Sequence, residues 1–311
     1  MAARRWVLNV FDPERIRQVA LALRTNGRYV EKDFHLVRAL SVIASIKVDG
    51  VIPAFSGGTS LATAWQLIHR FSEDIDFKVT LNAASATAGR KQGSAYRKEI
   101  IEGLTAAGFV LDGEPLVGNG SRFFRVSFHY GATFPVAVGT RPTLQIEMTF
   151  TGTHLPPKLR PVQSLLGRAL KAEPEVSALL CVDPVETAAD KLSALAWRVA
   201  ARDRSSGTDD PSIVRHLHDL AALAPTVGGS PLLRPLARQI LEADAKRAGD
   251  AAADGLSLLQ AMLPKVVGDP LWRREYEDFV IAVSFGPDAD RISFDRAVAE
   301  CEGLVARVLA A

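Results

Sequence analysis

Apolar residues recur every three or four positions in several segments of the first half of the chain, which predicts helices there. Asp12-Pro13 supplies the cap and the first-turn proline with which one such segment begins. A second segment of the same period starts near Phe34, and a third runs from Arg90 to Ala107, where Gly108 is expected to end it. We therefore expect these three segments to be helical.

Four segments between and after these helices have the patterns of β-strands. The apolar run 51–55 is typical of a short buried strand. Residues 74–79 alternate polar and apolar side chains, which predicts a strand with one buried face. Residues 123–130 and 144–150 are also expected to form strands, joined by a connection that contains glycine and proline. Together with the helices, these strands indicate an α/β fold.

The alternating strand 74–79 carries candidate chemistry, because Asp74 and Asp76 project from the same face of it. Two neighbouring carboxylates are difficult to ionise together without a cation, so the pair suits a divalent metal ion. With a third carboxylate, the pair would suit two ions that align an in-line displacement at phosphorus. Glu147 is the best candidate for that third carboxylate, since it lies on one face of the strand 144–150. The alternative, a strand glutamate that faces solvent, stays open.

A glycine-rich turn comes directly after the first strand. Gly57 and Gly58 allow a sharp turn that brings backbone N–H groups close to a ligand, and Thr59 and Ser60 begin the next helix. Apolar residues at helical spacing extend that expected helix: Leu61, Ala64, Trp65 and Ile68. Unpaired N–H groups at a helix start favour a triphosphate. A glycine pair alone usually marks only a tight turn, but glycines, a helix and paired carboxylates in this order predict a nucleotide site.

The second half of the chain is predicted to be helical. Asp183-Pro184 is a strong helix start, and Lys191 and Arg198 share one flank of the helix that follows. This flank suits a triphosphate or an RNA backbone, although periodicity alone favours a solvated basic edge. The polar loop 202–210 predicts a boundary between a catalytic domain, 1–205, and a helical domain, 206–311.

Composition sets broader limits. The chain has 311 residues, of which 48% are hydrophobic and 23% charged, without a long uncharged apolar run or a signal-peptide pattern, so we expect a cytoplasmic protein with no membrane segment. A net charge of +2 decides neither for nor against nucleic acid. Cys181 and Cys301 lie among apolar residues and are expected to be core thiols. His216 and His218 are two positions apart on a helix, which disfavours a two-histidine metal site.

The segment 55–77 resembles the signature of the AbiEii/MenT nucleotidyltransferase toxins, and residues 70–77 (Arg-Phe-Ser-Glu-Asp-Ile-Asp-Phe) match it throughout. Two later segments, 189–192 (Ala-Asp-Lys-Leu) and 215–220, support the resemblance. Members commonly carry an acidic residue where this chain has His216, which leaves Asp219 as the matching position in the last segment.

This resemblance implies a polymerase-β-like nucleotidyltransferase core with a mixed sheet, followed by a C-terminal helical bundle. It implies Mg²⁺ at Asp74 and Asp76, a nucleoside triphosphate donor with CTP or UTP favoured, and the 3′ end of tRNA as acceptor. Lys191 would grip the triphosphate, and Asp219 would orient the acceptor hydroxyl or take its proton. A cognate antitoxin would restrain the toxin, and Ser72 beside the carboxylates is a possible phosphorylation target.

Two other functions remain open from the sequence. One is a nucleotidyltransferase that modifies a small molecule, such as an aminoglycoside, or a protein, since the chemistry of the site would be the same. The other is a catalytically silent nucleotide-binding module. The intact pair Asp74 and Asp76 argues against the silent module, because such a module needs no pair of metal ligands.

Overall fold

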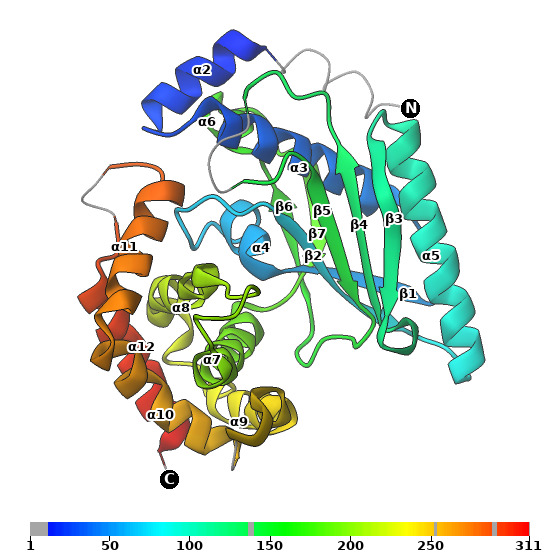
Figure 1. The fold of residues 1–311 in the computed structure, drawn as a ribbon. Coiled ribbons are helices and arrows are strands. Elements are labelled where there is room, and N and C mark those ends of the chain that lie inside the picture. Colours follow the sequence, from blue (N-terminus) through cyan, green and yellow to red (C-terminus); the bar gives the residue numbers. More distant parts are fainter. Residues whose placement is uncertain (1–11, 136–139, 252–253, 288–290, 311) are drawn as a thin grey trace. The chain divides into compact units, whose positions relative to one another are not determined.

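The computed structural model of the protein describes residues 12–135, 140–251, 254–287 and 291–310 (Figure 1). The chain divides into two compact units. The first comprises Met1–Val182 with Phe285–Pro287, and the second comprises Asp183–Ser284 with Asp288–Ala311. No helix of the described residues is long and apolar enough to cross a membrane.

A seven-stranded sheet forms the centre of the first unit, in the order β3-β4-β5-β2-β1-β7-β6. Its strands are β1 (Val51–Ser56), β2 (Asp74–Leu81), β3 (Val110–Gly118), β4 (Phe123–His129), β5 (Leu144–Thr149), β6 (Lys158–Val162) and β7 (Val176–Cys181). The pairs β2/β5 and β1/β7 are parallel, and the other neighbouring pairs are antiparallel. The mixed sheet that the family resemblance implied is therefore confirmed.

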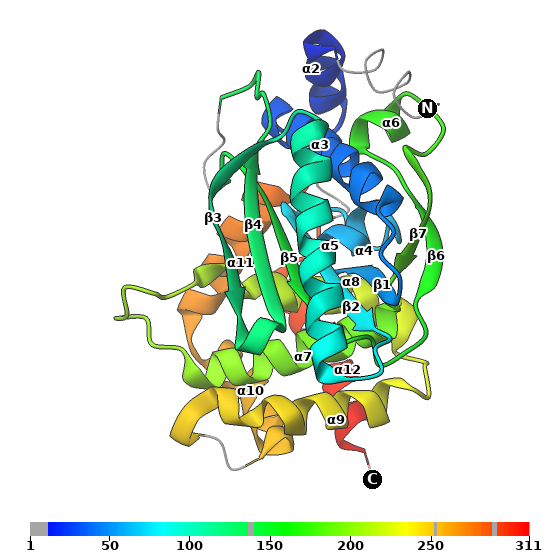
Figure 2. The ribbon, with the colours of Figure 1, turned by 90° about the vertical axis from the view of Figure 1, so that its right-hand side faces the viewer.

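Two long helices, α3 (Gly27–Ser45) and α5 (Ala86–Ala106), cover one face of this sheet (Figure 2). Their buried apolar residues share one core with the inward residues of β2, β4 and β5: Leu36, Leu40, Tyr96, Ile100, Ile75, Phe77, Val126 and Ile146. Because side chains alternate along a strand, the polar residues of β2 and β5 point to the opposite face. The expected one-sided burial of both strands is confirmed, and both predicted carboxylate positions are on that opposite face.

The remaining helices of the first unit are short: α2 (Pro13–Ala22), α4 (Gly57–Thr63) and α6 (Leu165–Ala169), with a 3₁₀ turn η1 (Asn119–Ser121). The expected cap of α2 is present, since the Asp12 carboxylate accepts a hydrogen bond from the Glu14 N–H at 2.9 Å. Gly108, with a φ of +88°, directly follows Ala107, the residue that caps α5. The predicted helix starts and stops in this unit are therefore largely confirmed.

Two differences from the sequence prediction concern this unit. The helix after the glycine turn ends at Thr63, so Trp65 and Ile68 are not helical, although both pack into the protein. Burial, not helical period, accounts for their apolar character. The strands β3, β6 and β7 were not predicted. β3 has nine residues, but it lies at a sheet edge with most of its side chains exposed, and β6 and β7 have five and six residues, so none of the three leaves a clear alternating pattern in the sequence.

The second unit is helical, as expected. It contains α7 (Pro184–Ala201), α8 (Val214–Val227), α9 (Leu233–Asp244), α10 (Gly255–Gly268), α11 (Pro270–Val283) and α12 (Phe294–Leu309), with 3₁₀ turns η2 (Pro211–Ile213) and η3 (Ala245–Ala251). The two units divide between Val182 and Asp183, earlier than the boundary expected at 205/206. The reason is that α7 packs its apolar seam against α8, α9 and α10, so it belongs to the helical unit.

Candidate active site

The turn between β1 and α4 requires glycine at its first position. Gly57 has a φ of +74°, in the left-handed region that glycine adopts without strain. A Cβ atom at Gly57 would also lie only 2.2 Å from Oδ2 of Asp76. Because α4 has only seven residues, the turn would bind an anion through individual backbone N–H groups and not through the dipole of a long helix. The sequence-predicted turn and the Asp76 carboxylate are thus in direct contact.

The side chains of Thr59 and Ser60 face the protein interior, with 1% and 2% of their surface exposed. The Thr59 hydroxyl donates a hydrogen bond to the backbone oxygen of Asp74 at 2.5 Å, which ties α4 to the start of β2. Any contact of these two residues with a nucleotide would therefore come from their backbone N–H groups and not from their hydroxyls.

Asp74 and Asp76 lie at the start of β2, on the face of the sheet opposite the core shared with α3 and α5. Asp76 contacts the glycine turn, and Asp74 forms an ion pair with Arg141. Both aspartates are half-buried. On this face of the sheet, the carboxylates of Asp74 and Asp76 lie beside the glycine turn, where a Cβ atom at Gly57 would not fit.

Glu147 lies directly opposite Asp76 in the parallel pairing of β2 and β5. Its carboxylate accepts hydrogen bonds from the Arg125 guanidinium at 2.7 Å and from the Gln145 amide at 2.6 Å. Among the described residues, no three histidine, cysteine, aspartate or glutamate side chains are arranged to hold one metal ion together. The role of Glu147 as a third metal ligand stays a prediction.

Ser72 and Gly58 are close neighbours. A Cβ atom added to Gly58 would lie 2.9 Å from the Ser72 hydroxyl and 2.8 Å from the Arg70 guanidinium. Arg70 is buried and donates to the backbone oxygen of Phe71 at 2.9 Å. The matched signature segment thus returns to the glycine turn, and it places the Ser72 hydroxyl against it.

The structure brings the other two predicted residues together within the second unit. The Lys191 ammonium on α7 lies 2.7 Å from Oδ2 of Asp219 on α8, and their side chains are 9% and 0% exposed. The Asp219 carboxylate also lies 3.4 Å from Nδ1 of His218. The buried Asp219 carboxylate therefore orients the Lys191 ammonium group.

Positive charge gathers around His216 in the same unit. Burial lowers the pKa of His216 well below its usual range, and the nearby cations Lys191, Arg215 and Arg198 lower this pKa further. The His216 side chain as a whole is half-buried, but both of its ring nitrogens are buried and have no hydrogen-bond partner among the described residues. The flank predicted to carry Lys191 and Arg198 therefore belongs to a cluster of ion pairs on and beside α7 and α8, in which Asp219 pairs with Lys191 and Asp210 pairs with Arg198 and Arg215.

Two residues near the carboxylates were missed by sequence reasoning. The Lys32 ammonium on α3 contacts Glu73 at 2.5 Å, and Arg141 contacts both Glu73 and Asp74. Burial lowers the pKa of Lys32, and the Glu73 carboxylate opposes that shift. Lys32 is fully buried, and it lies one and two helical turns before the buried Leu36 and Leu40, so a lysine in line with the apolar stripe of this helix was a signal that the sequence offered.

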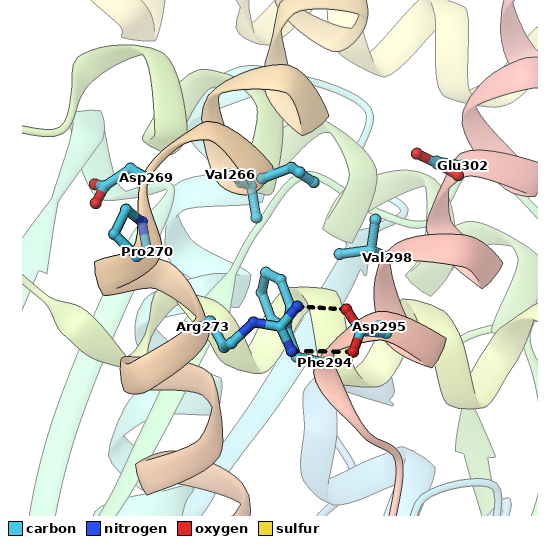
Figure 3. A pocket seen from close by; sticks show the side chains of 9 residues that line it. Val266, Asp269, Pro270, Arg273, Phe294, Asp295, Val298 and Glu302 are labelled. Carbon is cyan, nitrogen blue, oxygen red and sulfur yellow. Dashed lines mark hydrogen bonds and ion pairs between the residues drawn. The ribbon is translucent and has the colours of Figure 1, made fainter.

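A cavity of about 270 Å³ lies in the second unit, between α10, α11 and α12 (Figure 3). Arg273 and Asp295 form an ion pair in its wall, with one N–O distance of 3.0 Å. The cavity is lined by Val266, Val267, Asp269, Pro270, Arg273, Phe294, Asp295, Val298 and Glu302. None of the residues predicted from the sequence to form the site lines this cavity, so it is separate from the predicted chemistry.

Comparison with known proteins identifies the fold and the family. Among solved structures, the chain is similar to the MenT4 nucleotidyltransferase toxin from Mycobacterium tuberculosis, with a TM-score of 0.56 and 18% identity over 97% of this chain and 90% of that chain. This likeness shows a shared fold. A comparison with curated proteins found no matching sequence. The family model described as "Nucleotidyl transferase AbiEii toxin, Type IV TA system" matches residues 39–300, so the chain belongs to the AbiEii family of nucleotidyltransferase toxins from type IV toxin–antitoxin systems.

Proposed function

We propose that this nucleotidyltransferase toxin transfers a nucleoside monophosphate, with CTP or UTP as the favoured donor, to the 3′ end of tRNA, and thereby blocks translation in the cytoplasm. Membership of the family implies a nucleoside triphosphate, a divalent metal ion and an antitoxin partner. The observation that carries the proposal is the contact between the glycine turn and Asp76, with Asp74 on the same face of β2.

The residues present suit Mg²⁺, which proteins commonly bind through one or two carboxylates together with water and phosphate oxygens. Asp74 and Asp76 would supply the two carboxylates, with Glu147 as the predicted third. The glycine at position 57 leaves room for the Asp76 carboxylate where any Cβ would displace it. When bound, the metal ion would neutralise charge that develops on the transferred phosphoryl group.

The turn residues Gly57 and Gly58, and the backbone N–H groups of Thr59 and Ser60, would hold the triphosphate. Lys191 would contact a phosphate oxygen as a compact point charge. Its contact with Asp219 supports a shared role, in which Asp219 would orient the acceptor hydroxyl or take its proton. The acceptor oxygen would then bond to the α-phosphorus as the bond to the β-phosphate breaks and pyrophosphate leaves.

The acceptor is proposed from the family resemblance. Lys191, Arg198 and Arg215 lie on α7 and α8, where Asp219 pairs with Lys191 and Asp210 pairs with both arginines. Because these carboxylates offset most of the positive charge, the charge of this region does not choose between tRNA, an aminoglycoside and a protein. The choice of tRNA is made by the experiment below.

The test is transfer of label from each of four α-labelled triphosphates to total tRNA, an aminoglycoside panel or cell protein, with Mg²⁺ or with a chelator. We expect labelled tRNA only, with CTP or UTP and with the metal. Asp74→Ala and Asp76→Ala are each expected to lose at least about a hundredfold in rate. Asp112→Ala is the matched control, since Asp112 is an exposed aspartate on β3 of the same sheet.

Label on the aminoglycosides or on protein would replace tRNA as the acceptor. Bound nucleotide without any transfer would identify a silent binding module. Full activity in both aspartate variants would remove the proposed mechanism, whatever the acceptor.

A further inference from the structure

An ionic network connects helix α3 to the start of β2 through the segment that precedes β5. The buried Lys32 ammonium contacts the Glu73 carboxylate at 2.5 Å and the backbone oxygen of Arg141 at 2.8 Å. The Arg141 N–H donates to the same carboxylate at 3.1 Å. Glu73 is therefore held from two sides, and it fixes the backbone of Arg141.

A second buried pair on α3 anchors the same connection between β4 and β5. Arg28 and Glu31 form an ion pair at 3.2 Å, with side chains 1% and 0% exposed. The Glu31 carboxylate accepts from the N–H groups of Thr133 at 2.6 Å and Phe134 at 3.1 Å. Arg28 also donates to the backbone oxygen of Pro142, the residue directly after Arg141, at 3.4 Å, so a second buried side chain of α3 holds the chain beside Arg141.

The guanidinium of Arg141 contacts three side chains. Nη2 lies 3.3 Å from Glu73 and pairs with Oδ1 of Asp74, while Nη1 donates to Gln145 at 2.9 Å. Its Nε is buried and has no hydrogen-bond partner in the part of the chain that the structure describes. The side chain is 40% exposed, in contrast to the buried cations that anchor its backbone.

We propose that Arg141 is a nucleotide-binding residue, which pairs with Asp74 in the nucleotide-free protein and donates to a phosphate oxygen of the triphosphate when the metal–nucleotide complex binds. This inference rests on the proposed function, because it uses Asp74 as a metal ligand. A cation on Asp74 would withdraw the carboxylate charge that holds the guanidinium there. Glu73 keeps the guanidinium beside the site, where its planar fork suits a phosphate group.

Two consequences follow from this role. Removal of the Arg141 charge should strengthen metal binding in the absence of nucleotide, since the guanidinium and the metal ion compete for Asp74. The same change should weaken use of the triphosphate. A structural ion pair shares the first consequence, because it also occupies Asp74, but it does not predict the second, so the triphosphate measurement separates the two roles.

The experiment compares the full-length wild type with Arg141→Gln, which keeps a polar side chain without the charge, and with Arg141→Lys, which keeps the charge without the fork. The matched control is Arg273→Ala in the second unit, because Arg273 is 44% exposed and is paired with a carboxylate in the same manner. Binding of Mn²⁺ alone is measured by the electron paramagnetic resonance signal of the free ion, and KM and kcat are measured for the triphosphate.

For Arg141→Gln we expect Mn²⁺ affinity to rise about fivefold and KM for the triphosphate to rise at least about tenfold, with a smaller change in kcat. Arg141→Lys should keep the wild-type Mn²⁺ affinity and still show a raised KM, because an ammonium lacks the planar fork. Arg273→Ala should match the wild type in both measurements.

An Mn²⁺ affinity of Arg141→Gln that equals the wild type or the Arg273→Ala control would overturn the proposal, as would an unchanged KM. Failure of the proposed function looks different. In that case the wild type itself would bind Mn²⁺ no better than Asp76→Ala does, before Arg141 is considered at all.

Discussion

Substitution of Gly57 by alanine tests how closely the glycine turn and the Asp76 carboxylate depend on each other. The new Cβ would lie 2.2 Å from Oδ2 of Asp76, while ordinary contact begins at 3.4 Å, so the oxygen must move by about 1.2 Å. A displacement of about 1 Å in a catalytic group costs on the order of a hundredfold in rate. We therefore expect Gly57→Ala to lose about a hundredfold in nucleotidyl transfer.

The same substitution also has a backbone cost, which must be separated from the displacement of Asp76. Alanine in the left-handed region costs about 1–2 kcal/mol, partly offset by about 0.4–1 kcal/mol from the reduced entropy of the unfolded chain. Gly113 is the matched control, since its φ of +70° is close to the +74° of Gly57 and nothing lies within 4 Å of its Cβ position. Gly113→Ala should carry the backbone cost alone.

The assay measures the free energy of unfolding by denaturant titration and the transfer rate under saturating triphosphate, for the wild type and for both variants. Both variants should be destabilised by about 1 kcal/mol from the backbone alone. Only Gly57→Ala should lose transfer, and it should also bind Mn²⁺ less tightly. If Gly57→Ala keeps the transfer rate of Gly113→Ala, the contact between the turn and Asp76 does not position the carboxylate for the reaction.

Three other substitutions test separate parts of the structure. Asp219→Ala should lower the free energy of unfolding by about 3–5 kcal/mol, because it leaves the buried Lys191 ammonium without that carboxylate. A denaturant titration that shows a loss of unfolding free energy below about 1 kcal/mol would contradict this. Burial lowers the pKa of His35 to about 3, so below about pH 6.5 the unfolded protein binds a proton that the folded protein does not, and stability is lost as the pH falls. The free energy of unfolding of His35→Phe, relative to that of the wild type, should therefore rise by about 2 kcal/mol between pH 7.5 and pH 5. A constant difference would refute this. The wild-type curve alone is a poor test, because burial raises the pKa of Asp33 to about 6 and gives the opposite slope between about pH 4 and pH 6. Ser72→Ala should transfer at a near-normal rate, whereas a phosphate on Ser72 should abolish transfer, because it adds about −1.5 to −2 charges next to the glycine turn proposed to hold the triphosphate. Peptide mapping and the activity of a phosphorylated sample check this, and an active phosphorylated protein would exclude regulation at Ser72.

Local features of the sequence were sufficient for much of the fold. The two-residue period of 74–79 predicted a strand with aspartates on one face, and the burial of Ile75, Phe77 and Val79 confirms it. Caps such as Asp183-Pro184 predicted helix starts, because hydrogen bonds between a cap and the first turn involve only near neighbours in the chain. The glycine pair and the carboxylates were also visible, since each motif is short.

Other features were decided only by tertiary structure. The period after Gly58 predicted a longer helix, but the chain leaves α4 at Thr63 and buries Ile68 in irregular structure. Helix α7 was assigned to the catalytic domain from a polar loop at 202–210, yet packing against other helices places it in the second unit. In both cases long-range burial outweighed a local signal.

The sequence by itself determined the family signature, the glycine turn and the paired aspartates, because each is a contiguous motif with its own local chemistry. Only the tertiary structure decided which partners hold them. Lys32, Glu73 and Arg141 are separated by 41 and 68 positions, and no periodicity links residues so far apart. Their ion pairs form because the fold buries charges that must find partners, and that requirement is set by the completed fold and not by any segment of the chain.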